Sequence, residues 1–292
     1  MLTATAPTGT GAARQTSARR FMWLQMAAVV GLLTVLYIDI LPDLAAEWWT
    51  QPEASHGLLI PPIALYIAYM RREQTLRIPA EPDVRGLWLL AFGCLVFLLG
   101  SLASEFFLAR ISFVFMMAGL TWTFWGFRRL WTLIFPFVLL LTMVPLPAIV
   151  YNTIAAPLQL FASTVATDLA QALGVSIYRD GNIIHLANIS LGVAEACSGL
   201  HSLSAMVIAS LLLGYIYEAG YPGRILLLLF SVPLAIAINV LRVTGTALLA
   251  DYQTEFALGF YHSFSSWLVF LMGFGLLWLS SRLFFQGIRR VA

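Results

Sequence analysis

Charge is the scarcest property of this 292-residue chain, in which Asp, Glu, Lys and Arg together make up only 10% of the residues. A soluble domain carries about 25% charged residues, so this composition excludes an ordinary water-soluble fold. Hydrophobic residues reach 60%, and the mean hydropathy is +0.87. Because a transmembrane helix needs about 20 apolar residues, the chain has room for roughly eight spans and for no large soluble domain.

Several chemical features are also missing. Lysine is absent, so all 16 basic residues are arginines, and the two cysteines are too few for a disulfide framework. We find no cluster of metal ligands, no glycine-rich phosphate loop and no internal repeat, and we therefore expect no metal and no cofactor. The net charge is only +2, and the arginines form no nucleic-acid patch.

The apolar runs predict an all-α polytopic membrane protein with about eight transmembrane helices. We place these spans near residues 21–41, 56–70, 86–103, 106–126, 130–147, 198–217, 224–250 and 263–281. Residues 1–20 are small and polar, which predicts a disordered cytoplasmic tail. The apolar run that follows is about 21 residues long, too long for the core of a cleaved signal peptide. A single transmembrane domain is expected at 21–286, and a second cytoplasmic tail at 287–292.

The positions of the arginines predict the orientation of the chain. If the N-terminus is cytoplasmic, 13 of the 16 arginines fall in cytoplasmic segments, as the positive-inside rule requires. These are Arg14, Arg19, Arg20, Arg71, Arg72, Arg77, Arg85, Arg128, Arg129, Arg224, Arg282, Arg289 and Arg290. Acidic residues gather on the opposite side: Asp43, Glu47, Glu53, Glu105, Asp168, Asp180, Glu195, Asp251 and Glu255. Both termini are therefore expected in the cytoplasm, and the short second span must cross the membrane.

The one long stretch outside the predicted spans is 148–196, which we expect on the outer face. From Tyr151 to Leu173, apolar residues recur at three- and four-residue steps. This spacing predicts an amphipathic helix that lies in the membrane interface or over the bundle. The Asp180-Gly181 pair between two short apolar runs then predicts a β-hairpin. Helix and hairpin together form the expected extracytoplasmic cap, which leads directly to Cys197.

Three polar residues occur where predicted spans meet the outer boundary of the membrane: Cys197 in EACSGLHS, Arg242 in NVLRVTG and His262 in YHSFSSW. Arg242 follows the cytoplasmic Arg224 by 18 residues. That separation is roughly 27 Å of helix in a hydrocarbon core about 30 Å thick. Cys197 and His262 begin the sixth and eighth predicted spans from the same side. Because short loops join these consecutive spans, contact between them is favoured.

These residue types suit a cysteine acyl-transfer site. The thiolate is the nucleophile in such chemistry, and a neighbouring cation or a helix N-terminus favours the thiolate over the thiol. The guanidinium of Arg242 offers hydrogen-bond donors for the oxyanion of a tetrahedral intermediate. His262 belongs to the residue type that titrates near neutral pH, so it suits proton transfer to the leaving amine. Which of Arg242 and His262 donates that proton stays open.

Each of the three residues also has a structural explanation. Cys197 is compatible with a small packing residue, and His262 with a solvated residue at the interface. Arg242 is compatible with a structural ion pair to Asp251 or Glu195, although a charge within a span is by default functional or paired. The coincidence of all three at one depth favours the catalytic interpretation.

Four further residues are secondary candidates. Cys94, in the middle of a predicted span, is most simply a small buried packing residue. Arg110 is explained by a pair with Asp39 or Glu105. His56 more simply caps the outer end of the second span than lines a site. His201, one turn after Cys197, is equally compatible with contact to the thiol and with a place on the helix surface.

The blocks around Cys197, Arg242 and His262 resemble the exosortase/archaeosortase family of integral-membrane cysteine transpeptidases. The resemblance is extended by SHGLLIPPIALY (55–66), FPFVLLLTMVPLP (135–147) and RDGNIIHLANISLGVAEACSG (179–199), and it spans roughly residues 50–270. It implies that Cys197 is the nucleophile and that Arg242 and His262 are its catalytic partners. His201 departs from the arginine expected at that position in many relatives.

The resemblance also implies the substrates and the cellular location. The substrates are exported proteins with a C-terminal signal that consists of a short motif, commonly Pro-Glu-Pro, one membrane helix and a basic tail. The location is the bacterial inner membrane, with the active site facing the periplasm. The resemblance also links the protein to exopolysaccharide production.

The predicted function is therefore an exosortase-like cysteine protease and transpeptidase. It would cleave such signals through a Cys197 thioester and transfer the protein to an unidentified acceptor. The alternative is a non-enzymatic membrane subunit of polysaccharide export, or a small transporter. Transport is disfavoured by the lack of paired inverted repeats and of a carboxylate deep in a span. A serine protease using Ser198 lacks a suitable nucleophile motif. The expected partners are exported proteins and the lipid bilayer, and no nucleic acid.

Overall fold

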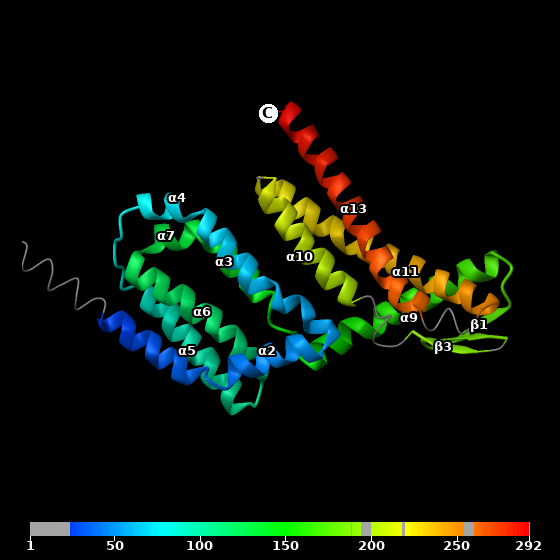
Figure 1. Cartoon of the computed structure of the whole chain (residues 1–292), viewed down its shortest axis with the longest axis horizontal. Coiled ribbons are helices and arrows are strands. Elements are labelled where there is room, and N and C mark those ends of the chain that lie inside the picture. The colour runs from blue at the N-terminus through cyan, green and yellow to red at the C-terminus, as the bar shows by residue number, and fades with distance from the viewer. Residues whose placement is uncertain (1–23, 188, 194–199, 218–219, 254–259, 292) are drawn as a thin grey trace, which may run out of the picture.

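A computed structural model describes residues 24–187, 189–193, 200–217, 220–253 and 260–291. The described part is mostly helical, with one small sheet (Figure 1). Its N-terminal elements are the helix Leu24–Leu36, α2 (Ile40–Thr50), the 3-10 helix η1 (Pro52–Leu58), α3 (Ile60–Met70), α4 (Arg72–Arg77), α5 (Gly86–Leu102), α6 (Phe106–Trp125), α7 (Phe127–Thr132) and α8 (Ile134–Leu141). Its C-terminal elements are α9 (Ala148–Ala172), β1 (Ile177–Asp180), β2 (Ile183–Leu186), β3 (Ser190–Gly192), α10 (Leu200–Ile216), α11 (Tyr221–Tyr252) and α13 (Phe260–Val291).

Among the described residues, three helices are long and apolar enough to cross a membrane by length and composition: α6, α9 and α11. The helix Leu24–Leu36 and α2 together make a fourth candidate, although they are bent by 55° relative to each other. The apolar helix α5 and the apolar stretches Ser202–Ile216 and Trp267–Leu283 are shorter. A multi-pass helical membrane protein is thus supported, whereas the predicted number of eight spans is not confirmed.

Two of the predicted spans consist of separate pieces in the structure. The span expected at 56–70 is divided between η1 and α3, whose first turn contains Pro61 and Pro62. The span expected at 130–147 is divided between α7 and α8, and α8 has only 8 residues. Proline lacks a backbone N–H and fixes φ, so it begins or interrupts helices. The apolar runs are present as predicted, but they are not continuous helices.

Helices α5 and α6 form an antiparallel hairpin held together by very close backbone approach. A Cβ atom added at Gly86 would lie 2.5 Å from the backbone nitrogen of Thr123, and one added at Gly100 would lie 2.5 Å from that of Ala109. Gly93 lies midway between them, against Met116. Seven-residue spacing places these glycines on one face of α5, and small residues on such a face let membrane helices pack closely.

Helices α10, α11 and α13 pack against one another in the C-terminal part of the chain. They meet at Gly273 of α13, where an added Cβ would lie 2.6 Å from Ile238 Cδ1 of α11 and 3.4 Å from Met206 Sδ of α10. Leu227 of α11 and Leu277 of α13 are fully buried in the same cluster. These three consecutive helices therefore form one unit, as the short loops between the predicted spans suggested.

The sheet has the order β1-β2-β3, with both pairs antiparallel. The turn at Gly181, where φ is +60°, joins β1 to β2 and confirms the predicted hairpin. Strand β3 was not predicted. The buried face of the sheet, including Ile184 and Leu186, packs against Ala166 of α9 and Ala247 of α11. This contact fixes the sheet on the C-terminal half of α11, while α4, α7 and the end of α13 lie toward the opposite, upper side of Figure 1.

Candidate active site

Arg242 is a cation buried inside the molecule, on the half of α11 that carries the sheet. It is 7% exposed, and its backbone carbonyl accepts a hydrogen bond from the Thr246 hydroxyl at 2.9 Å. The next residue, Val243, packs in the apolar cluster that includes Ile184 of β2. Enclosing a guanidinium among apolar side chains is costly, so such a residue marks a functional or paired position.

Asn239 lies three residues before Arg242, on the same side of α11, and is 3% exposed. The sequence analysis did not single it out, although an amide three residues before an arginine in an apolar span was a usable signal. The hydroxyls of the buried Thr244 and Thr246 bond to carbonyl groups of the same helix. Asn239 and Arg242 therefore make the polar face of α11 at this level.

The described residues show no ion pair between Arg242 and Asp251, one of the two partners considered for a structural role. Asp251 is exposed and follows Arg242 by nine residues. Nine residues are two and a half turns of helix, which places the two side chains on opposite sides of α11. The other partner considered, Glu195, lies outside the described residues.

His262 lies in the first turn of α13, which begins at Phe260. Its side chain is outside the described part of the chain. Three helical turns, or roughly 16 Å, separate it from Gly273, the residue at which α13 packs against α10 and α11.

Cys197 and the neighbouring Ser198 lie outside the described residues. The described residues that flank this segment are Val193, which is 2% exposed, and Leu200, the first residue of α10. Val193 belongs to the same apolar cluster as Val243, the neighbour of Arg242 in sequence. The chain therefore enters the segment with Cys197 from a point packed beside the buried part of α11.

The two other candidate histidines lie on elements close to this region. His201 is in the first turn of α10, and its side chain is outside the described residues. His56 lies in η1 and is half-buried. η1 contacts α10 and also packs on α2, where a Cβ added at Gly57 would overlap the Trp48 indole. Its location fits the predicted outer end of the second span.

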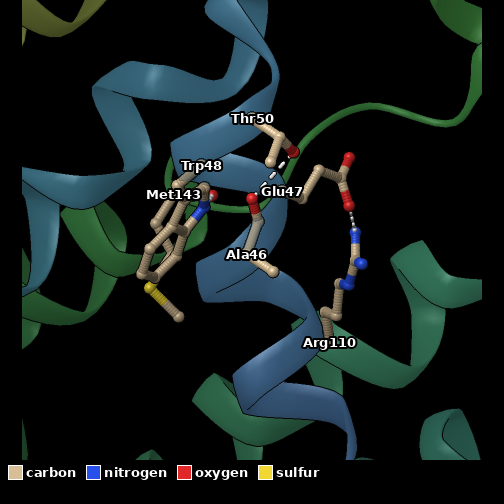
Figure 2. Close-up of polar contacts among 6 residues, drawn as sticks. All are labelled: Ala46, Glu47, Trp48, Thr50, Arg110 and Met143. Atoms are coloured by element: carbon tan, nitrogen blue, oxygen red, sulfur yellow. Dashed lines mark hydrogen bonds and ion pairs between the residues drawn. The ribbon is translucent and has the colours of Figure 1, made fainter.

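Arg110 is a second buried arginine, and the structure gives it a different partner from the one expected (Figure 2). Its Nη1 lies 2.5 Å from Oε2 of Glu47. The prediction that Arg110 forms an ion pair is therefore confirmed, but the predicted partners, Asp39 and Glu105, are wrong. The bend before α2 carries Glu47 across to α6. Arg110 and Glu47 side chains are only 8% and 20% exposed. The pair links the first part of the chain to α6.

Cys94 is exposed on the surface of α5, so the prediction that it is a buried packing residue is wrong. The buried face of α5 is the one that carries Gly86, Gly93, Val96 and Gly100, and it packs on α6. Cys94 directly follows Gly93 and therefore points away from that face. In a membrane, this outward face is the one that meets lipid.

The described part of the chain has helices long enough to cross a membrane. It also has a buried arginine on α11, the middle one of three packed helices. These two features define an integral-membrane protein with an internal polar site. A comparison with family models identifies the transmembrane exosortase family (Exosortase_EpsH), which matches residues 48–279. The chain therefore belongs to the transmembrane exosortase family, and the resemblance predicted from sequence is confirmed. Exosortases are membrane-embedded transpeptidases of the cysteine protease type that act on exported proteins with C-terminal sorting signals. Comparisons with curated proteins and with solved structures give no match.

Proposed function

We propose that this protein cleaves the C-terminal sorting signals of exported proteins and transfers the released proteins to an acceptor, with Cys197 as the nucleophile. The observation that carries the proposal is the burial of Arg242 on α11, beside the flank of the Cys197 segment. Val193 packs in the same cluster as Val243, and Cys197 follows Val193 by four residues. Four residues of extended chain span at most about 14 Å, which supports the proposal that Cys197 lies near Arg242.

The proposed reaction has two acyl-transfer steps. In the first, the Cys197 sulfur forms a bond to the carbonyl carbon at the cleavage site, the peptide C–N bond breaks, and the amine leaves with a proton. In the second, an acceptor nucleophile or water attacks the thioester and releases the thiol. Arg242 is proposed to hydrogen-bond the oxyanion or to donate the proton, and His262 to act as acid and base or to stabilise the transition state.

The proposed substrates carry a short motif, commonly Pro-Glu-Pro, then one membrane helix and a basic tail. The proposed location is the bacterial inner membrane, with both termini in the cytoplasm and Cys197 facing the periplasm in the outer leaflet. Several arginine-bearing elements support this orientation, because α4 and α7 lie toward one side of the molecule and the sheet toward the other (Figure 1). A link to exopolysaccharide production is part of the same proposal.

Replacement of each cysteine tests the proposal. Cells would express the full chain with a reporter protein that ends in Pro-Glu-Pro, an apolar helix and an arginine-rich tail. Cys197→Ser and Cys197→Ala are expected to abolish cleavage while the protein still inserts in the membrane. Cys94→Ser is the matched control and is expected to cleave normally, because Cys94 lies on the outward face of α5. Full cleavage by Cys197→Ala would contradict the proposal and favour a non-enzymatic role.

A further inference from the structure

Strand β3 lies at an edge of the sheet, and the register shows which of its backbone groups face outward. The Val193 N–H donates to the Asn182 carbonyl, and the Leu186 N–H donates to the Ile189 carbonyl. Leu191 pairs with Ile184 between these two bonds. Because backbone groups alternate in direction along an antiparallel strand, the N–H and C=O groups of Ser190 and Gly192 point away from β2.

These outward groups are open within the described part of the chain. Ser190 and Gly192 are both exposed, and a Cβ added at Gly192 would meet no atom within 4 Å. Neither residue has a backbone hydrogen bond at this edge among the described residues. At the opposite edge of the sheet, the Gln171 side-chain amide of α9 donates to the Ile177 carbonyl of β1 at 2.8 Å. Among the described residues, the β3 edge is the open edge that is nearer to Cys197 along the chain.

The open edge is held rigidly beside the candidate active site. The inner face of the sheet packs on α9 and on the part of α11 that follows Arg242. The chain runs from Gly192 to Cys197 in only five residues. A peptide bound along β3 would therefore lie next to the segment that holds the nucleophile. Peptide segments that bind to sheet edges do so in the extended conformation, through main-chain hydrogen bonds.

We propose that the β3 edge binds the extended recognition segment of the exported substrate by strand addition. This inference rests on the proposed function and assigns Ser190 and Gly192 as the residues that position the substrate backbone. The edge is short, so it can pair with about three substrate residues. A Glu between two prolines suits this edge. The Glu exchanges backbone hydrogen bonds with one residue of β3. The backbone groups of the two flanking prolines then point away from β3, where a missing N–H costs no hydrogen bond.

Variants at Gly192 test this proposal with a matched control. Gly192→Pro removes the outward N–H without removing a hydrogen bond of the sheet, and edge strands tolerate proline at such a position. Gly192→Ala keeps the N–H and places its Cβ in open space. With the purified full chain and a Pro-Glu-Pro reporter, Gly192→Pro is expected to raise KM about tenfold with kcat nearly unchanged, whereas Gly192→Ala stays within about twofold of wild type.

A second arm leaves the enzyme unchanged. A synthetic reporter peptide with N-methyl-Glu at the centre of the motif loses one edge-facing N–H, and its cleavage by wild-type enzyme is expected to show a similar rise in KM. Wild-type kinetics for both Gly192→Pro and the N-methyl peptide would overturn strand addition. If Cys197→Ala is inactive in the same assay, the proposed function still stands after that result. Cleavage by Cys197→Ala would overturn the proposed function itself.

Discussion

At the scale of single residues, the fold treats its two buried arginines differently. Arg110 is neutralised by Glu47 across the contact between α2 and α6 (Figure 2). Arg242 lies on α11 beside Val243 and the sheet, and Asp251 does not pair with it. A buried arginine that pairs with a carboxylate across two helices is expected to serve stability, and we propose that Arg242, beside the flank of the Cys197 segment, serves chemistry.

For Arg242, we predict that the shape of the guanidinium matters as well as its charge. Lysine offers a point charge and cannot reproduce the fixed fork of donors, so Arg242→Lys is expected to lower the cleavage rate roughly 100-fold or more. Arg77→Lys is the control, because Arg77 is exposed. Cleavage rates of the reporter in matched membranes would measure both. Wild-type turnover by Arg242→Lys would exclude an oxyanion or proton-donor role for this residue.

For the Arg110–Glu47 pair, we predict that removing one partner costs more stability than removing both. Arg110→Leu leaves the Glu47 carboxylate largely buried without its cation, which is expected to cost about 3 kcal/mol. The double variant with Glu47→Leu is expected to recover most of this loss. Unfolding of the full chain in detergent would measure the cycle. Additive losses in the double variant would mean that the two side chains do not interact.

At the scale of elements, the glycine face of α5 determines how closely α5 and α6 approach. We predict that Gly100→Ala destabilises the protein by about 1–3 kcal/mol, because the new Cβ would meet the Ala109 backbone, which cannot move aside as a side chain can. Gly275→Ala on α13 is the control, since its Cβ would have nothing within 4 Å. Alanine has the higher helix propensity, by about 1 kcal/mol, so the control is expected to be neutral or stabilising.

Thermal unfolding of the two alanine variants in detergent gives the comparison directly. Equal stability of Gly100→Ala and Gly275→Ala would show that the backbones of α5 and α6 do not approach as closely as described.

The elements that sequence predicted well are those with long and uninterrupted apolar runs. The span expected at 106–126 is α6, and the one expected at 224–250 is α11, because a 20-residue apolar segment has few alternatives to a helix. The hairpin at Gly181 was also predictable, because Asp-Gly is a strong turn signal. Strand β3 was not, since Ser190–Gly192 is short and ends in glycine, which gives no strand pattern.

The polar contacts were harder to predict than the elements. The sequence placed Glu47 on the same side as the start of α6, and the structure brings the two together. That Arg110 pairs with Glu47, and not with Asp39 or Glu105, depends on the bend between the first helix and α2. The outward direction of Cys94 likewise depends on which face of α5 meets α6. The sequence singles out Arg242 because a charge in an apolar span is conspicuous, and its catalytic role stays a prediction, as do those of Cys197 and His262.

At the scale of the whole molecule, we predict that Cys197 is reached from the periplasmic side. In a Cys94→Ser background, a membrane-impermeant maleimide added to intact spheroplasts is expected to label Cys197 slowly. The cysteine introduced by Arg77→Cys is expected to react only after lysis, because the positive-inside rule predicts that this arginine-rich region is cytoplasmic. Labelling at position 77 in intact spheroplasts would invert the orientation and separate the thiol from exported substrates.

The most direct test of the central claim is to isolate the acyl-enzyme. The full chain would be mixed with the reporter, quenched in acid and digested, and the modified peptide identified by mass spectrometry. The account predicts the reporter's new C-terminal residue joined to the Cys197 sulfur, in a bond that neutral hydroxylamine breaks. Reporter cleavage without an adduct at Cys197 in Cys94→Ser enzyme, or with the adduct on another residue, would contradict it.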